Sequence, residues 1–431
     1  MTALVGIINV RGAAIAADSA VTMTRDRNRK IANSANKMLR LSSAQPVSVM
    51  ICGSGMFLGT PWDIIIRRYR QKRGQVSLPT VQECVGDFFS YMVSEKVLFP
   101  DIYEKRFLKY SLCNFFQVLR EDVPFIDIND EGEFKNVKLI IKTFKSEIKK
   151  SIASMEQFGK CPMFVDYTLE QFTKKTSSVV DEFIEEQLED NDFLSYPVEV
   201  YQAIRDDLVA GLLCYVTTRS ENEGATLVFT GFGADEDYPT LISVNVNEGF
   251  DGRVCYHVKD EDIVHVSADK PVAICPFAQT DIMKSLLTGV NPGFNNVACE
   301  RGSQMYMEFD RMLQESVCGE ELDEEFSGIL QEVKCLDLYH SFERFDKKLM
   351  GQSSKQWLKT LRDYDLQDMA QLAENLIAMT SLERHMTFSE EGVGGPIDLA
   401  IITKNNGFTW LSRKSWYHHV DVGGRYGKFG V

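Results

Sequence analysis

The sequence predicts an α+β fold in which helices cover antiparallel sheets. Short apolar runs come in pairs separated by turn residues, which is the pattern of β-hairpins and not of parallel strands joined by helices. Helical segments lie between these pairs in blocks, so the order along the chain is strands, helices, strands, helices and strands. Layers of helices on antiparallel sheets are the arrangement that this order favours.

The first two hairpins are expected within the first 53 residues. Residues 3–10 are apolar at consecutive positions, which indicates a strand buried on both faces, and residues 13–17 form its partner. A second pair covers residues 37–42 and 47–52, and we expect the polar segment 25–36 to be a loop.

The remaining elements follow from apolar periodicity and from turn residues. Helices are expected near 57–73, 80–95, 136–156, 168–188, 278–289, 298–317, 321–349 and 354–381. Strands are expected near 225–232, 240–247, 252–258 and 262–268, and a closing hairpin near 396–411.

Composition excludes several classes of protein. The 62 acidic and 47 basic residues give a formal net charge of −15, which argues against nucleic-acid binding. No apolar run reaches the length of a membrane helix. The N-terminal apolar run is not preceded by a basic segment, so we do not expect it to be a signal peptide. The 10 cysteines form no CxxC pair, so we expect reduced thiols in a cytoplasmic protein, with no metal site and no cofactor.

Hairpin register brings chemically useful residues to the strand ends. A turn centred near residues 10–11 places Thr2 opposite Ser19 and diagonal to Asp18. A second turn centred between Ala44 and Gln45 places Lys37 opposite Cys52, whose neighbour is Gly53.

Thr2 has a special chemical position because removal of Met1 would make it the N-terminal residue. A free α-amine has a reference pKa of about 7.7–8.0, and a nearby cation lowers it. The amine could then act as general base for the hydroxyl of the same residue. Lys37 would supply the positive charge, Asp18 would keep Lys37 protonated, and the N–H of Gly53 could donate to an oxyanion.

At these residues the sequence resembles the proteasome β-subunit family of N-terminal nucleophile hydrolases, with the related bacterial HslV and Anbu proteins. The resemblance rests on Thr2, AIAADSAVT at 14–22, the strand that follows Lys37 and ICGSG at 51–55. The segments at 224–249 and 392–403 resemble the middle hairpin and the late Gly-Gly strand of that family, so the match covers about half the chain in three pieces.

The resemblance implies a four-layer αββα sandwich of two antiparallel sheets with extra helices. The hydrolase core would comprise residues 1–95, 196–292 and 354–431. Two helical insertions would occupy residues 96–195 and 293–353, because family subunits are about half this length.

The resemblance also assigns roles to single residues. Thr2 would be nucleophile and base, Asp18 and Lys37 the charge pair, and Gly53 the oxyanion donor. Glu390 falls where the family has its late aspartate. Val21, Ile51 and Gly55 would line the substrate site and favour an apolar side chain before the scissile bond.

Two positions depart from the family pattern. Ala278 lies in the stretch where the family has a serine near the threonine amine, and Val393 replaces its late serine. Gln279 or Thr280 could substitute for the first serine.

Three functions remain open at this point. The first is a threonine peptidase that cleaves peptides or unfolded proteins, assembled as a homo-oligomeric ring or spiral with an ATP-dependent unfoldase as a possible partner. The second is an amidohydrolase of the same chemistry acting on a small amide. The third is an inactive scaffold or interaction protein on the same fold, which the two substituted serine positions suggest.

Overall fold

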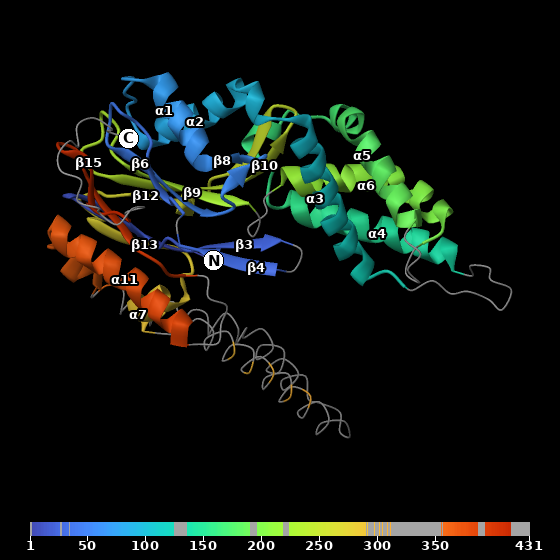
Figure 1. Cartoon of the computed structure of the whole chain (residues 1–431). Helices are drawn as coiled ribbons and strands as arrows, with labels where there is room; N and C mark the ends of the chain where they lie inside the picture. The colour runs from blue at the N-terminus through green and yellow to red at the C-terminus, as the bar shows by residue number, and fades with distance from the viewer. Residues whose placement is uncertain are drawn as a thin grey trace, which may run out of the picture. The chain divides into compact units, whose positions relative to one another are not determined.

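A computed structural model of the chain is mixed α+β with antiparallel sheets, which confirms the coarse fold class (Figure 1). The structure describes residues 2–25, 28–33, 35–124, 136–189, 196–218, 224–289, 357–386 and 393–414, and the single positions 291, 297, 301, 304, 308, 311 and 355. The chain divides into two compact units, which are Met1–Lys37 with His265–Val431, and Met38–Val264.

The elements of the first unit come from both ends of the chain. The strands are β1 (Ala3–Asn9), β2 (Gly12–Ala17), β3 (Val21–Arg25), β4 (Asn28–Ala32), β13 (Val272–Ala278), β14 (Asp398–Thr403) and β15 (Gly407–Ser412). The helices are α7 (Asp281–Thr288) and α11 (Leu366–Met386).

The elements of the second unit come from the middle of the chain. The strands are β5 (Met38–Arg40), β6 (Val47–Gly53), β7 (Met56–Phe57), β8 (Thr60–Pro61), β9 (Ala225–Gly231), β10 (Thr240–Phe250), β11 (Arg253–His257) and β12 (Ile263–His265). The helices are α1 (Trp62–Arg73), α2 (Val81–Ser94), η1 (Lys96–Leu98), α3 (Asp101–Glu121), α4 (Val137–Glu156), η2 (Pro162–Phe164), α5 (Leu169–Glu189), α6 (Val198–Thr217) and η3 (Asp260–Asp262).

The sheet of the first unit is antiparallel and has the strand order β13-β1-β2-β14-β15. Every residue of β1 and β2 is buried, as their continuous apolar sequences predict. Leu4 pairs with Ala17 and Asn9 with Gly12, which is the register expected for the first hairpin. Helices α7 and α11 lie together along this sheet (Figure 1). Their apolar side chains pack with Ala3, and with other residues of β1, to form one core cluster.

Two strands of the first unit depart from the sequence prediction. Strands β3 and β4 form a hairpin, so the expectation of a loop over 25–36 is wrong at Arg25 and at residues 28–32. β-Branched residues such as Thr22 and Ile31 favour a strand even where the composition is polar. Strand β13 contains Pro276, which has no N–H to donate, and such a residue is tolerated because β13 is the end strand of the sheet.

The sheet of the second unit has the order β11-β10-β9-β6-β5, and β12 also pairs with β10. Helices α1 and α2 cover one face of it (Figure 1). Trp62, Ile65 and Phe88 from these helices pack in the same core cluster as Val49 of β6 and Phe229 of β9. Helix α1 starts later than its sequence pattern suggests, because the short β7–β8 hairpin precedes it.

The register of the second hairpin differs by one residue from the expectation. Met38 pairs with Met50 and Leu39 with Val49, so the predicted pairing of Lys37 with Cys52 is wrong. The difference arises in the turn, where the N–H of Leu41 donates to the carbonyl of Val47 at 2.9 Å and closes the loop one position earlier. A shift of one residue exchanges the two faces of a strand.

Helices α3 to α6 form a bundle that adjoins the second sheet (Figure 1). Helices α4 and α5 confirm the sequence prediction, whereas α3 and α6 are additional. Aromatic contacts hold the bundle, since Phe144 stacks on Phe116 with 5.5 Å between ring centroids. Phe164 of η2 lies 4.7 Å from Phe250 of β10, which joins the bundle to the sheet. Residues 293–353, the second predicted insertion with its two expected helices, lie almost entirely outside the described residues.

We predict that truncating Phe144 to alanine destabilises the protein by about 3–5 kcal/mol, because the cavity cannot be refilled by the flanking helices. The Phe144 side chain is fully buried and contacts the rings of Phe116 and Tyr196. Urea unfolding followed by circular dichroism measures the change. Phe158→Ala is the matched control, because Phe158 is 55% exposed. Equal effects of the two substitutions would contradict the structure.

Candidate functional site

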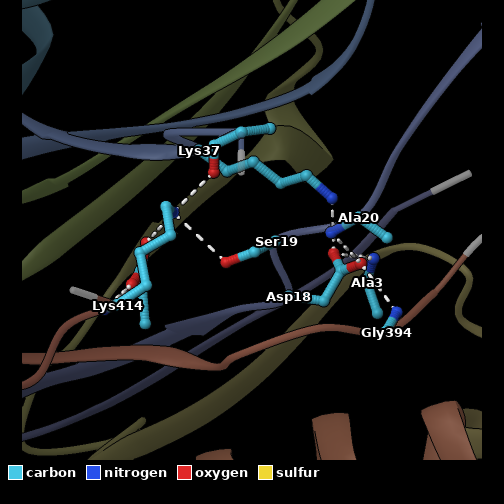
Figure 2. A network of polar contacts seen from close by, with 9 residues as sticks. Ala3, Asp18, Ser19, Ala20, Lys37, Gly394 and Lys414 are labelled. Carbon is cyan, nitrogen blue, oxygen red and sulfur yellow. Dashed lines mark hydrogen bonds and ion pairs between the residues drawn. The ribbon is translucent and has the colours of Figure 1, made fainter. Parts of the chain in front are cut away.

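The Asp18 carboxylate is the centre of a buried polar network at the end of β2 (Figure 2). Only 1% of Asp18 is exposed. Its Oδ1 accepts a hydrogen bond from the N–H of Ala3 at 2.9 Å. Its Oδ2 accepts from the N–H of Ala20 at 3.2 Å and from the N–H of Gly394 at 3.1 Å. Buried carboxylates require such compensation, because an unpaired charge away from water costs several kcal/mol.

Lys37 completes this network. Its Nζ lies 2.6 Å from Oδ1 of Asp18, and the two side chains are 6% and 1% exposed. The structure therefore brings together two of the residues singled out from the sequence. Oδ1 accepts both from Lys37 and from the N–H of Ala3. The ammonium group thus lies beside the peptide group that joins Thr2 to Ala3.

Thr2 lies at the start of β1, and it is 9% exposed. Its carbonyl accepts a hydrogen bond from the N–H of Gln279 at 3.0 Å, which fixes the backbone of Thr2 against the end of β13. Ala278, opposite Ala3, has a φ of 62°, which is unusual for a residue with a side chain. Left-handed backbone of this kind costs about 1–2 kcal/mol, so the turn beside Thr2 is held by its surroundings.

A second buried ion pair lies next to the first, and sequence reasoning missed it (Figure 2). Lys414 Nζ lies 2.5 Å from Oδ2 of Asp398, and the side chains are 5% and 3% exposed. The same Nζ donates to Oγ of Ser19 at 3.2 Å and to the carbonyl of Ala35 at 2.6 Å. Because Ser19 follows Asp18, and Ala35 lies two residues before Lys37, Lys414 holds together the two segments that carry the first pair.

No local sequence signal points to Lys414. It follows the closing hairpin, and the hairpin pattern there predicts only strands and a turn. Asp398 at the start of β14 is an indirect clue, since an aspartate that opens a buried strand needs a partner.

Gly53 ends β6 in the second unit, with a φ of 81°. A Cβ at this position would clash with the carbonyl oxygen of Gly224, so only glycine fits. The N–H of Ser54 donates to that same carbonyl at 2.8 Å. In an antiparallel ladder alternate residues bond to opposite neighbours. The N–H of Gly53 therefore points away from β9, towards the side of β5, whose pairing with β6 extends only over Ser48–Met50.

The three residues predicted to bind substrate have different environments. Val21 opens β3 and is half-buried. Ile51 is 7% exposed and belongs to the apolar core cluster of the second unit. Gly55 has open space where a side chain would be, because no described atom beyond its chain neighbours lies within 4 Å of the place a Cβ would take.

A cavity of about 600 Å³ opens in the second unit directly after Gly53. Its volume is in the range of pockets that hold small molecules or side chains. The loop after β6 forms one wall and helix α3 another. Burial raises the pKa of the Glu248 carboxyl in this cavity, while the N–H of Leu58 that donates to it acts in the opposite direction. The lining residues are Ser54, Met56, Leu58, Gly59, Tyr103, Arg106, Phe107, Tyr110, Gly224, Asn247 and Glu248.

The structure describes some, but not all, of the predicted site residues near residue 390. Glu390 lies outside the described residues. Val393 is 2% exposed and packs in the core cluster of the first unit, where it makes no polar contribution. The polar contact in this segment comes from the backbone of Gly394, whose carbonyl also accepts from the N–H groups of Ser19 and Ala20 at 3.2 Å and 3.0 Å.

Two comparisons with known proteins identify no relative. A scan against protein-family models and a search of curated proteins both found no match. Within the part of the chain that the structure describes, no group of three or more His, Cys, Asp or Glu side chains is arranged to hold a metal ion. In that same part, each helix is too short or too polar to cross a membrane.

We predict that Asp18→Asn lowers the free energy of unfolding by about 3–5 kcal/mol, because the buried Lys37 ammonium loses its counterion. The double substitution Asp18→Asn with Lys37→Met should restore part of this loss. Thermal and urea unfolding of the single and double variants measure the coupling. The exposed pair of Lys174 and Glu170 is the control, and breaking it should change stability by less than about 0.5 kcal/mol. Additive effects of the two buried substitutions would contradict a coupled pair.

We also predict that Lys414→Met loosens the segments on either side of the Asp18–Lys37 pair. Hydrogen exchange of the amides near residues 18–20 and 35–37 should become at least about tenfold faster, which corresponds to about 1.4 kcal/mol. Lys359→Met, at an exposed position, is the matched control. Unchanged exchange at both segments in the Lys414 variant would show that it does not hold them together.

Proposed function

We propose that this chain is an N-terminal nucleophile hydrolase of the proteasome β-subunit type, with Thr2 as its nucleophile after removal of Met1. The observation that carries the proposal is the Asp18 oxygen that accepts from both Ala3 and Lys37. This contact supports the proposal because the buried ammonium shares an acceptor with the N–H of Ala3, the residue that follows the proposed nucleophile. The two antiparallel sheets with their helices are compatible with the four-layer αββα core that the proposal requires.

In the proposed reaction the α-amine of Thr2 takes the proton from the hydroxyl of the same residue as Oγ attacks a peptide carbonyl. The N–H of Gly53 donates to the oxyanion of the tetrahedral intermediate. The amine then gives its proton to the leaving nitrogen, and the C–N bond breaks. Water, activated by the same amine, hydrolyses the ester between the acyl group and Thr2 and restores the free residue.

Lys37 and Asp18 act through charge. A cation beside an amine favours the neutral form of that amine, which is the form that can accept a proton. Asp18 is the counterion of Lys37 in a site from which water is nearly excluded, where electrostatic effects are stronger than at the surface. Lys414 is a positioning residue in this scheme, because it touches the segments that carry the pair and not the reacting atoms.

The proposed activity is that of a threonine endopeptidase, and the proposed substrates are peptides or unfolded proteins. The cavity after Gly53, with apolar groups such as Met56 and Phe107, suits a large apolar side chain. The resemblance to ring-forming relatives supports homo-oligomer formation, and an ATP-dependent unfoldase is the proposed partner. The proposed location is the cytoplasm, in keeping with the free thiols of the described cysteines.

A specific observation supports one alternative, a catalytically inactive scaffold on the same fold. The resemblance aligns Ala278 and Val393 with two family serines, and neither side chain can hydrogen-bond the α-amine. A scaffold has no need for a buried Asp18–Lys37 pair beside Thr2, however, so activity is the better interpretation. An amidohydrolase of a small amide would use the same residues with a different substrate.

An epoxyketone peptide tests the proposal, because it forms a ring with both the amine and the hydroxyl of an N-terminal threonine. Intact-mass measurement should show loss of Met1 and one adduct per chain in the wild-type protein. Thr2→Ala should give no adduct, and Thr2→Ser, which keeps a hydroxyl, should still react.

Lys37→Met should slow formation of the adduct by on the order of 10²-fold, since it removes the charge that activates the amine. Retained Met1 together with absence of the adduct would overturn the proposal and favour the scaffold. Adduct formation with hydrolysis of small amides but not of peptides would favour the amidohydrolase.

A further inference from the structure

Two cysteines and a histidine that take no part in the proposed reaction meet in the second unit. Cys161 directly precedes η2, in the segment that follows α4. Cys255 and His257 both belong to β11, and residues two apart on a strand face the same side. The contact between His257 and Cys161 brings this side of β11 against Cys161.

The three side chains lie close together. Sγ of Cys161 lies 3.0 Å from Nε2 of His257. The Cys255 thiol lies close enough to Cys161 for each to affect the pKa of the other. Cys161 and Cys255 are 0% and 1% exposed, and the N–H of Cys161 is fixed by a 2.7 Å hydrogen bond to the carbonyl of Thr217. His257 is half-buried, so it is the most exposed of the three residues.

The two thiols differ in their tendency to ionise. The neighbouring Cys255 thiol lowers the pKa of Cys161 to about 6, and His257 acts in the same direction against the effect of burial. Burial raises the pKa of Cys255 well above its usual range. At Cys84 the result is different, because burial together with nearby carboxylates raises its pKa to about 12. Cys161 thus has the character of an attacking thiolate, and Cys255 that of a protonated partner.

We propose that Cys161 and Cys255 form a reversible disulfide when the protein meets hydrogen peroxide, with His257 as the proton acceptor. The geometry carries this inference, since Cys161 contacts the imidazole of His257 at 3.0 Å and Cys255 lies on the same side of β11 as that imidazole. A thiol that is merely structural needs neither a second thiol nor an imidazole beside it.

The reaction has two steps. His257 takes the proton of Cys161, and the thiolate attacks one peroxide oxygen. The O–O bond breaks, Cys161 becomes a sulfenic acid, and the departing hydroxide takes the proton from His257 as water. The sulfur of Cys255 then attacks the sulfur of Cys161 and releases the S–O oxygen as water, together with the proton that Cys255 loses. Two thiols are oxidised by two electrons, and one peroxide is reduced to two waters.

The bond would connect parts of the unit that are distant in sequence. Strand β11 is an end strand of the second sheet, and η2 lies between helices α4 and α5 of the bundle. A covalent link here closes a long loop, and longer loops give larger entropic stabilisation. The oxidised protein should therefore unfold at a higher temperature than the reduced protein.

Peptide mapping under non-reducing conditions tests the proposal on the full chain. After treatment with hydrogen peroxide we expect a Cys161–Cys255 linked peptide with a mass lower by two hydrogens, which disappears on reduction. Cys113 is the internal control, because it is exposed and its ionisable neighbours are Lys109 and Glu186. The melting temperature should rise with the linked fraction and return on reduction.

Two variants separate the roles of the residues. Cys255→Ser should abolish the link and leave a sulfenic acid on Cys161 that dimedone traps. His257→Asn should slow the formation of the link by about tenfold or more, because the thiolate fraction falls. Oxidation of Cys113 in a wild-type sample whose Cys161 and Cys255 stay unlinked would overturn the proposal, and this result needs no variant to fold.

Discussion

A single buried carboxylate determines how the first unit is put together. Asp18 accepts hydrogen bonds from the backbone of Ala3, Ala20 and Gly394 and from the side chain of Lys37. Three of these donors, those of Ala3, Lys37 and Gly394, belong to different segments, so one negative charge fixes the end of β2 against three other stretches of chain. Removing a charge of this kind leaves several donors without an acceptor, which is more costly than losing an exposed ion pair.

The second pair, Asp398 with Lys414, shares this role through Ser19 and Ala35. Two Asp–Lys pairs thus fix the segments around Asp18 and Lys37. Buried pairs do not automatically add stability, because desolvation offsets much of the attraction. Their value here is geometric, since they fix the positions of a cation and of the strand that follows Thr2.

Much of this arrangement could be predicted from the sequence, and the reasons for the rest are specific. The register of the first hairpin follows from its tight turn, so the closeness of Asp18 to Ala3 could be inferred. The second hairpin has a longer turn, and its predicted register is wrong by one residue. Lys414 could not be found, because its contacts join residues hundreds of positions apart. The β3–β4 hairpin could not be recognised, because its polar composition gives no sign that the two strands pair.

The hydrogen bond from Gly394 to Asp18 spans 376 positions of the chain. Contacts with such separation form late, since the loop between them must close first. During synthesis, the N-terminal segment leaves the ribosome long before Gly394 is made. The network around Asp18 is therefore incomplete until Gly394 has been translated, and the proposed hydrolase, which depends on it, would stay inactive until then. The position of Gly394 along the chain would thus determine when activity can begin.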